Sequence, residues 1–295
     1  MYKSRFAVPA RMSDATSLLV LSCALVHAQT PPAGAAPPAP TLQSGSAASL
    51  NDALLAKATS LYDSTAKSGL HSFVCQVHPD WNKIMSSARK SAPAAADEAK
   101  AALLGTIKIT LHARLDGGST LDWQPPESPE IPLDPAAKSM FNKAHKDVET
   151  TLLGILKFWT QLVNGSVAES LGETDVDVTQ TGDGYTLHSK DKRYPLTEEF
   201  DRDLLLMHFI TVDSASTADI APTFRPSGRG LLVQSFVARI QPTGAGPAAA
   251  QEMHIGLEYQ TVSAIQIPAR ITVELPNVVE MDFALDGCTV NAASN

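Results

Sequence analysis

The stretch from His71 to Trp81, HSFVCQVHPDW, places one cysteine, two histidines, an aspartate and a tryptophan close together. Three kinds of chemistry use such residues. Histidine and aspartate side chains bind metals, a cysteine with a histidine base attacks electrophiles, and a cysteine also forms disulfides. The rest of the sequence decides which of these three is expected.

A metal site is the least supported of the three. His71 and His78 are seven positions apart and point to opposite faces of a continuous strand, although a bend at Pro79 could gather them with Asp80. The chain contains no HExxH and no CxxC motif. We therefore predict surface or capping roles for the two histidines, and no metal or cofactor.

The N-terminus is typical of a secretory signal peptide. Three basic residues precede the apolar run SLLVLSCALV, which is too short to span a bilayer as a helix. Small or aliphatic residues then favour cleavage after Ala28, so we expect residues 1–28 to be removed. A loose lipobox makes lipid attachment to Cys23 the alternative. Either way the protein is predicted to be periplasmic or secreted.

Cleavage after Ala28 leaves Cys75 and Cys288 of the three encoded cysteines. Oxidising compartments favour disulfides, so we predict that these two cysteines pair. On the chain-entropy model, closing so long a loop stabilises the fold by about 4–5 kcal/mol. A reactive Cys75 with His78 as its base stays open as the alternative.

Composition narrows the function further. Apolar residues make up 44% of the chain and charged residues 18%, which is enough to build a packed core. The formal net charge is -8 and no run of basic residues occurs, so a nucleic-acid partner is not expected. GxSxG and phosphate-loop motifs are also missing from the sequence, and we assign no catalytic residue.

Two groups of carboxylates could form a glycosidase-like pair or a calcium site. One is the segment EEFDRD at residues 198–203, and the other is the pair Glu280 and Asp282 on one strand face. Neither group has a diagnostic spacing. We predict that both belong to a solvated rim.

The elements that must position these residues follow from periodicity. Residues 29–48 are rich in Pro and Ala and without charge, so they are predicted to be a flexible linker. A single domain is expected at residues 49–291. Helices are predicted at 49–67, from 81 with residues 91–104 as the continuation of the same helix, and at 136–171, where one broad apolar face indicates burial.

Alternating apolar residues predict strands, in chain order, at 71–78, 106–115, 119–123, 175–179, 185–189, 204–212, 231–240, 253–262, 264–275 and 278–290. Gly228 to Gly230 is predicted to be a turn with Arg229 exposed, and Pro268 to mark an edge or a bulge. The fold class is therefore α+β. We expect a curved antiparallel sheet of eight to ten strands, a half-open barrel, with helices packed on its apolar face.

The inward sides of these strands, with the long helix, carry much large apolar surface and few polar groups. Such a surface forms either a sealed core or the wall of a cavity for an acyl chain or another apolar ligand. The side chains predicted to line that cavity are Ile109, Leu111, Phe158, Trp159, Phe236, Leu257, Tyr259, Ile271, Met281 and Phe283.

The order of elements resembles the LolA/LolB-like lipoprotein carriers: a signal peptide, a helix, a strand with Ser72-Phe73, a curved meander, IPARITVEL at 267–275, and a last strand that ends at Val290-Asn291. The resemblance covers about residues 50–291 and implies a half-open barrel with helical lids that shields acyl chains in the periplasm. The Pro-rich segment at 124–135, the long helix and the expected disulfide depart from that pattern. No binding residue of the family can be carried over.

Three functions follow from these observations. The first is a monomeric, non-catalytic protein that binds an apolar small molecule, a lipid or a lipoprotein. The second is a secreted hydrolase whose polar residues are scattered along the chain. The third is a structural module of the envelope with a protein partner.

Overall fold

The computed structural model describes residues 53–54, 56–64, 68–87, 95–115, 118–124, 135–163, 176–189, 195–212, 216–244, 250–276 and 278–291. The predicted signal peptide and linker, and nearly all of the Pro-rich segment at 124–135, lie outside these ranges. None of the described helices is both long enough and apolar enough to cross a bilayer.

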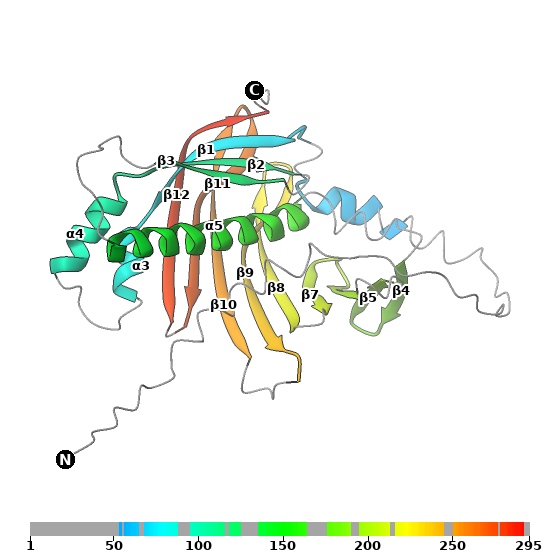
Figure 1. The fold of residues 1–295 in the computed structure, drawn as a ribbon. Coiled ribbons are helices and arrows are strands. Elements are labelled where there is room, and N and C mark those ends of the chain that lie inside the picture. Colours follow the sequence, from blue (N-terminus) through cyan, green and yellow to red (C-terminus); the bar gives the residue numbers. More distant parts are fainter. Residues whose placement is uncertain are drawn as a thin grey trace, which may run out of the picture.

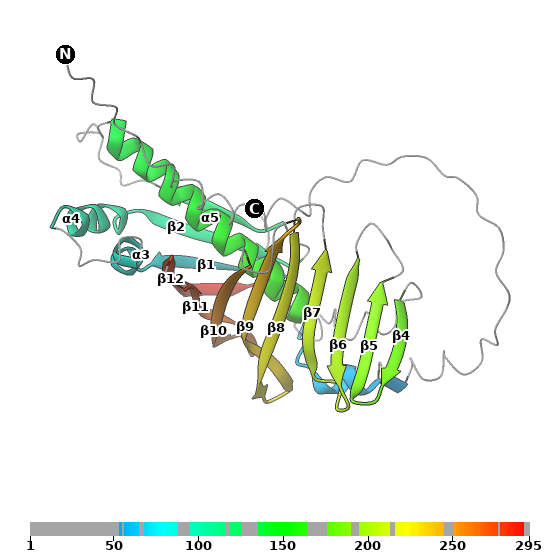
Figure 2. The same cartoon turned by 90° about the horizontal axis from the view of Figure 1, so that it is seen from below.

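One antiparallel sheet of twelve strands organises the molecule, in the order β3-β2-β1-β12-β11-β10-β9-β8-β7-β6-β5-β4. The sheet is open, with β3 and β4 at its two ends, and it is strongly curved (Figures 1 and 2). The strands are β1 (Ser72–Pro79), β2 (Lys108–Arg114), β3 (Thr120–Gln124), β4 (Val176–Thr181), β5 (Gly184–Ser189), β6 (Leu196–Asp201), β7 (Leu206–Val212), β8 (Ser216–Ser227), β9 (Gly230–Pro242), β10 (Gln251–Val262), β11 (Ile265–Leu275) and β12 (Val279–Val290).

Strands β4 to β12 follow one another as a meander, and β1 then pairs with β12. This pairing brings the first and last strands of the chain side by side. The α+β class with an antiparallel sheet is confirmed, but the expected eight to ten strands were too few. Strands β6 and β8 were missed.

Side-chain alternation gives the sheet one apolar face. Directly opposed pairs such as Ile271 with Phe283, and Val273 with Met281, are buried on the same side of β11 and β12. We call this side, which also carries Phe73 and Phe236, the inner face. Its burial follows from the period of two that the sequence shows.

Helix α5 (Pro135–Val163) crosses the inner face (Figures 1 and 2). Its sequence repeats large apolar residues every three or four positions, which makes one broad stripe on the helix. The buried members of this stripe are Val148, Leu152, Ile155, Leu156, Trp159 and Leu162. The predicted helix at 136–171 is thus confirmed up to residue 163, and its remainder lies beyond the described part.

Two shorter helices follow β1. Helix α3 (Trp81–Ser87) starts at the predicted position, and α4 (Ala95–Leu104) is a separate element before β2. The backbone amide of Lys83 donates to Asp80 Oδ1 at 2.9 Å, so Asp80 caps α3. Pro79 therefore ends the strand and Asp80 begins the helix, as expected.

The first described helical residues are 53–54 and 56–61, and the helix ends earlier than the predicted position near Gly69. Tyr62 leaves the helix because it forms a β-bridge with Leu231. Its hydroxyl donates to Leu204 O and accepts from the amide of Leu206, both at 2.7 Å. This single side chain therefore joins the N-terminal helix to the turn between β6 and β7.

Candidate functional site

The stretch from His71 to Trp81 does not form one chemical cluster. On β1, Cys75 points to the inner face and is buried, whereas His78 is exposed. His78 Nε2 lies 3.1 Å from Asp286 Oδ1, and the amide of His71 donates to Asn291 Oδ1 at 2.8 Å. His78 thus makes a surface contact through its side chain, and His71 makes a capping contact through its backbone amide. Within the described ranges, no three His, Cys, Asp or Glu side chains gather as a metal site would require.

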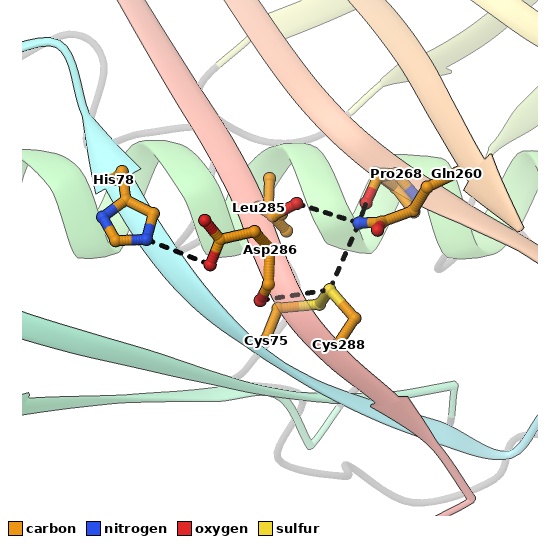
Figure 3. Close-up of a disulfide and its surroundings, with 7 residues drawn as sticks. All are labelled: Cys75, His78, Gln260, Pro268, Leu285, Asp286 and Cys288. Carbon is orange, nitrogen blue, oxygen red and sulfur yellow. Dashed lines mark hydrogen bonds and ion pairs between the residues drawn. A yellow bond between two sulfur atoms is a disulfide. The ribbon is translucent and has the colours of Figure 1, made fainter. Parts of the chain in front are cut away.

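Cys75 and Cys288 form a disulfide between β1 and β12 (Figure 3), so the predicted pairing is confirmed. The alternative, a reactive Cys75 with His78 as its base, is wrong for this state. The sulfur is already bonded, and the two side chains lie on opposite sides of the strand.

A β-bulge places the disulfide. Val74 pairs with Thr289 and Gln76 pairs with Asp286, so Cys75 faces both Gly287 and Cys288. Gly287 has φ +56°, a backbone conformation that favours glycine. The extra residue on β12 is what lets the two cysteines meet.

Gln260 fills the space beside this bulge, where β11 is no longer paired with β12. Its Nε2 donates to Leu285 O at 2.9 Å and Pro268 O at 3.2 Å, and lies 3.2 Å from Cys288 Sγ (Figure 3). Pro268 itself lies opposite Tyr259 at a register shift, which confirms the predicted bulge. One side chain of β10 thus ties three strands together at the disulfide.

The prediction of a solvated acidic rim was wrong in two places. Glu198 is 1% exposed and lies on the same side of β6 as the buried Phe200. Asp282 is 4% exposed and accepts hydrogen bonds from the guanidinium of Arg270. Strand alternation thus buries Glu198, and a partner on the neighbouring strand covers Asp282, although acidic residues are usually exposed.

The turn at Gly228–Gly230 is confirmed, and Arg229 is exposed as expected. Sequence reasoning missed its partner: Arg229 Nε lies 3.4 Å from Oδ1 of the buried Asp63. Ser227 Oγ donates to Asp63 Oδ2 at 2.8 Å. A Cβ at Gly230 would come within 2.7 Å of the backbone at Leu61 and Asp63, so the turn needs glycine to approach the N-terminal segment.

The ten side chains predicted to line a cavity come together in one hydrophobic cluster. Eight of them are buried, and Phe158 and Tyr259 are partly buried against the others. Helix α5 contacts strands β1 and β9 through two adjacent residues. Trp159 meets Phe73 of β1 edge-to-face at 5.9 Å, and Phe158 lies 6.4 Å from Phe236 of β9. The sheet therefore wraps around this turn of α5.

A small polar group lies within this apolar region. Trp159 Nε1 donates to the Tyr259 hydroxyl at 3.0 Å, and that hydroxyl donates to Val233 O at 2.6 Å. Burial raises the pKa of Tyr259, so the phenol stays neutral at any physiological pH. The guanidinium of Arg225 lies 5.0 Å from the centre of the Tyr259 ring. Sequence reasoning missed Arg225 because β8 was not predicted to be a strand.

A separate open hollow of about 730 Å³ lies where α3 meets α4. None of the ten predicted side chains lines it. Its lining residues are Pro79, Asp80, Trp81, Asn82, Glu98, Ala101, Ala102 and Gly105.

No protein-family model, curated protein or solved structure matches the chain. The resemblance to the LolA/LolB-like carriers therefore stays a prediction, and the inner face and its surroundings are the features of the molecule that bear on its function.

Proposed function

We propose that the protein is a non-catalytic carrier that binds a lipid or acyl chain on the inner face of a LolA-like half-open barrel. The observation that supports this proposal most directly is the arrangement of α5. One amphipathic helix lies across a broad apolar surface to which β1, β2 and β9 to β12 all contribute. Displacing one helix would expose a continuous apolar groove.

The energetics make such an exchange reasonable. Hydrophobic contacts have no fixed direction, so an acyl chain can replace the contacts that side chains of α5 now make. Each buried methylene contributes about 0.8 kcal/mol, and ten methylenes therefore contribute about 8 kcal/mol. That is comparable to the cost of withdrawing two or three large side chains, at about 1.5–3 kcal/mol each. A long chain can thus compete with the Phe158 and Trp159 turn of α5 for this surface.

The proposed place of action is the periplasm or the extracellular space. The signal-peptide pattern at residues 1–28 supports this placement, and so does the disulfide between Cys75 and Cys288, because such bonds persist in oxidising compartments. Cell fractionation that recovers the protein from the cytoplasm, with both cysteines reduced, would contradict it.

A structural or protein-interaction module of the envelope is the second candidate. The tight packing of the inner face favours it, since eight of the ten predicted cavity residues are already buried against protein. Under this alternative α5 seals a permanent core and no ligand enters.

Native mass spectrometry separates the two functions. The protein, purified from an envelope fraction without added lipid, is expected to carry one lipid-sized adduct that solvent extraction removes. The extract then identifies the lipid. A chain that is free of adducts, and that takes up no lipid on incubation with envelope extract, would favour the interaction module.

A further inference from the structure

The contacts that Arg225 makes within the described part of the fold leave part of its guanidinium without a partner. It lies on β8 opposite Leu232 of β9 and is half-buried. Its Nη2 donates to Gln266 Oε1 at 3.3 Å, and its guanidinium packs over the ring of Tyr259. The buried Nε of Arg225 has no hydrogen-bond acceptor among the described residues.

Two other arginines each have a buried carboxylate as their partner, which Arg225 lacks in the part of the chain that the structure describes. Arg229 pairs with the buried Asp63, and Arg270 forms a two-pronged pair with the buried Asp282. No carboxylate of the described chain lies within 4 Å of Arg225. A buried N–H without an acceptor is unfavourable, because it has lost its hydrogen bonds to water and gained none in the fold, so this site favours an acceptor from outside the chain.

The position of Arg225 connects it to the inner face. Tyr259 stacks against the guanidinium on one side, and its hydroxyl accepts a hydrogen bond from Trp159 of α5 on the other. A charged group bound by Arg225 would therefore lie next to the turn of α5 that covers the apolar surface. Its tail would point to the surface proposed for an acyl chain.

We propose that Arg225 binds the carboxylate of a long-chain fatty acid, with the hydrocarbon chain on the inner face. This inference rests on the proposed function and adds the class of ligand. The planar fork formed by Nε and Nη of a guanidinium matches the two oxygens of a carboxylate. A single half-buried guanidinium, whose neighbour Arg229 is already neutralised by Asp63, fits one small monoanion better than a bulky phosphodiester headgroup.

The test compares two probes with the same tail: 11-(dansylamino)undecanoic acid and its methyl ester, which has no charge. Dansyl fluorescence gives the Kd of each for the wild type, Arg225→Gln, Arg225→Lys and Arg239→Gln. Arg239 is an exposed arginine on the neighbouring strand β9, so its substitution is the control for loss of one charge. A short-chain phosphatidylglycerol competitor reports on phosphate headgroups.

We expect the wild type to bind the acid about ten times or more tightly than the ester, because a hydrogen-bonded charge pair is lost with the ester. Arg225→Gln should lose that preference and keep ester binding, Arg225→Lys should fall between, and Arg239→Gln should behave as wild type. Equal affinity of the wild type for acid and ester would overturn the role of Arg225 and leave the carrier proposal standing. Absence of binding by both probes would overturn both proposals.

Two further outcomes are decisive. Displacement of the acid by phosphatidylglycerol at lower concentration than by unlabelled fatty acid would show that the carboxylate assignment is wrong. If circular dichroism shows that Arg225→Gln does not fold, the acid-to-ester ratio of the wild type still decides, since it requires no variant.

Discussion

The two faces of strands β11 and β12 are built on different principles. On the inner face, Ile271 opposes Phe283 and both are fully buried. On the outer face, Arg270 Nε donates to Asp282 Oδ1 at 2.8 Å and its Nη2 to Oδ2 at 2.5 Å, while Lys83 of α3 lies 4.0 Å from the same carboxylate. The outer contacts are directional and fix strands and helix in place. The inner contacts have no direction, so an apolar ligand can replace part of them.

Truncation on the inner face should have the largest effect. Phe283→Ala removes a fully buried ring, and we expect the unfolding free energy to fall by about 3–5 kcal/mol. Urea denaturation followed by circular dichroism measures this change. Thr289→Ala on the same strand, at an exposed position, is the matched control and should change the free energy by less than about 0.5 kcal/mol. Similar losses in both variants would contradict the difference between the faces.

Loss of the disulfide should rank next. The bond closes a separation of 213 residues. Its removal is expected to lower the unfolding free energy by about 2–4 kcal/mol, the typical range for disulfides, which lies below the chain-entropy value because an unfolded chain retains some structure even without the bond. The double variant Cys75→Ala, Cys288→Ala should therefore melt lower than wild type in a denaturant titration without reductant. Addition of reductant should destabilise the wild type and leave the double variant unchanged. A reductant effect of equal size in both proteins would contradict this account.

The outer ion pair should contribute less, because Arg270 is partly open to water. We expect Asp282→Asn to lower the unfolding free energy by about 1–2 kcal/mol, since one charge-assisted pair is weakened. Phe283→Ala, measured under the same conditions, allows the loss of unfolding free energy on the outer face to be compared with the loss on the inner face. A loss for Asp282→Asn as large as that for Phe283→Ala would mean that the outer face dominates stability.

The pH dependence provides a second test of the same pair. Hydrogen bonds from Arg270 hold the pKa of Asp282 below its usual value. A carboxylate with a lowered folded pKa stabilises the fold above its unfolded pKa of about 4, and this stabilisation is lost as pH falls through the folded value. Wild type should therefore lose more stability than Asp282→Asn between about pH 5 and pH 2. Parallel stability curves for the two proteins would contradict this assignment.

The smallest effect is expected at His78. Both side chains of its pair with Asp286 are exposed, and exposed ion pairs contribute little to the unfolding free energy. His78→Ala should change the unfolding free energy by less than about 0.5 kcal/mol and leave fatty-acid affinity unchanged. A loss of ligand binding in this variant would restore His78 as a functional residue.

The parts of the fold that the sequence predicts well are those with a strict period. Apolar residues occupy every second position from Ile265 to Leu275 and from Val279 to Leu285, and strands β9 to β12 were all placed within a few residues. The apolar stripe of α5 repeats over many turns, and the start of this helix was placed within one residue. The disulfide was predictable because only two cysteines remain after the expected cleavage.

Strand β8 was missed because it contains Pro222 and Pro226, which usually argue against a strand. The structure explains why they are tolerated. Pairing of β8 with β7 extends only from Thr217 to Ile220, so both prolines lie in the half of β8 that is bonded to β9 alone. This half behaves as an edge, where a missing N–H does no harm. The sequence of β8 does not show where its pairing with β7 stops, so the prolines could not be placed in a half-paired strand.

The candidate site was predictable only in its apolar part. All ten side chains named for the inner face do lie in one cluster, because alternation fixes which side of a strand a residue faces. Arg225 could not be found this way. A register shift between Thr223 and Phe224 changes the alternation just before it, and its contact with Tyr259 joins residues that are far apart in sequence.

The central claim, that an acyl chain lies on the inner face, is tested most directly by quenching of Trp159. In a Trp81→Phe, Trp123→Phe background Trp159 is the single tryptophan, and it is buried on α5 against Phe73 of β1. We predict that a fatty acid brominated on its hydrocarbon chain quenches this fluorescence saturably, with one site per chain, and that the unbrominated acid competes. Saturable binding without quenching, or quenching that rises linearly with the brominated acid, would contradict the account.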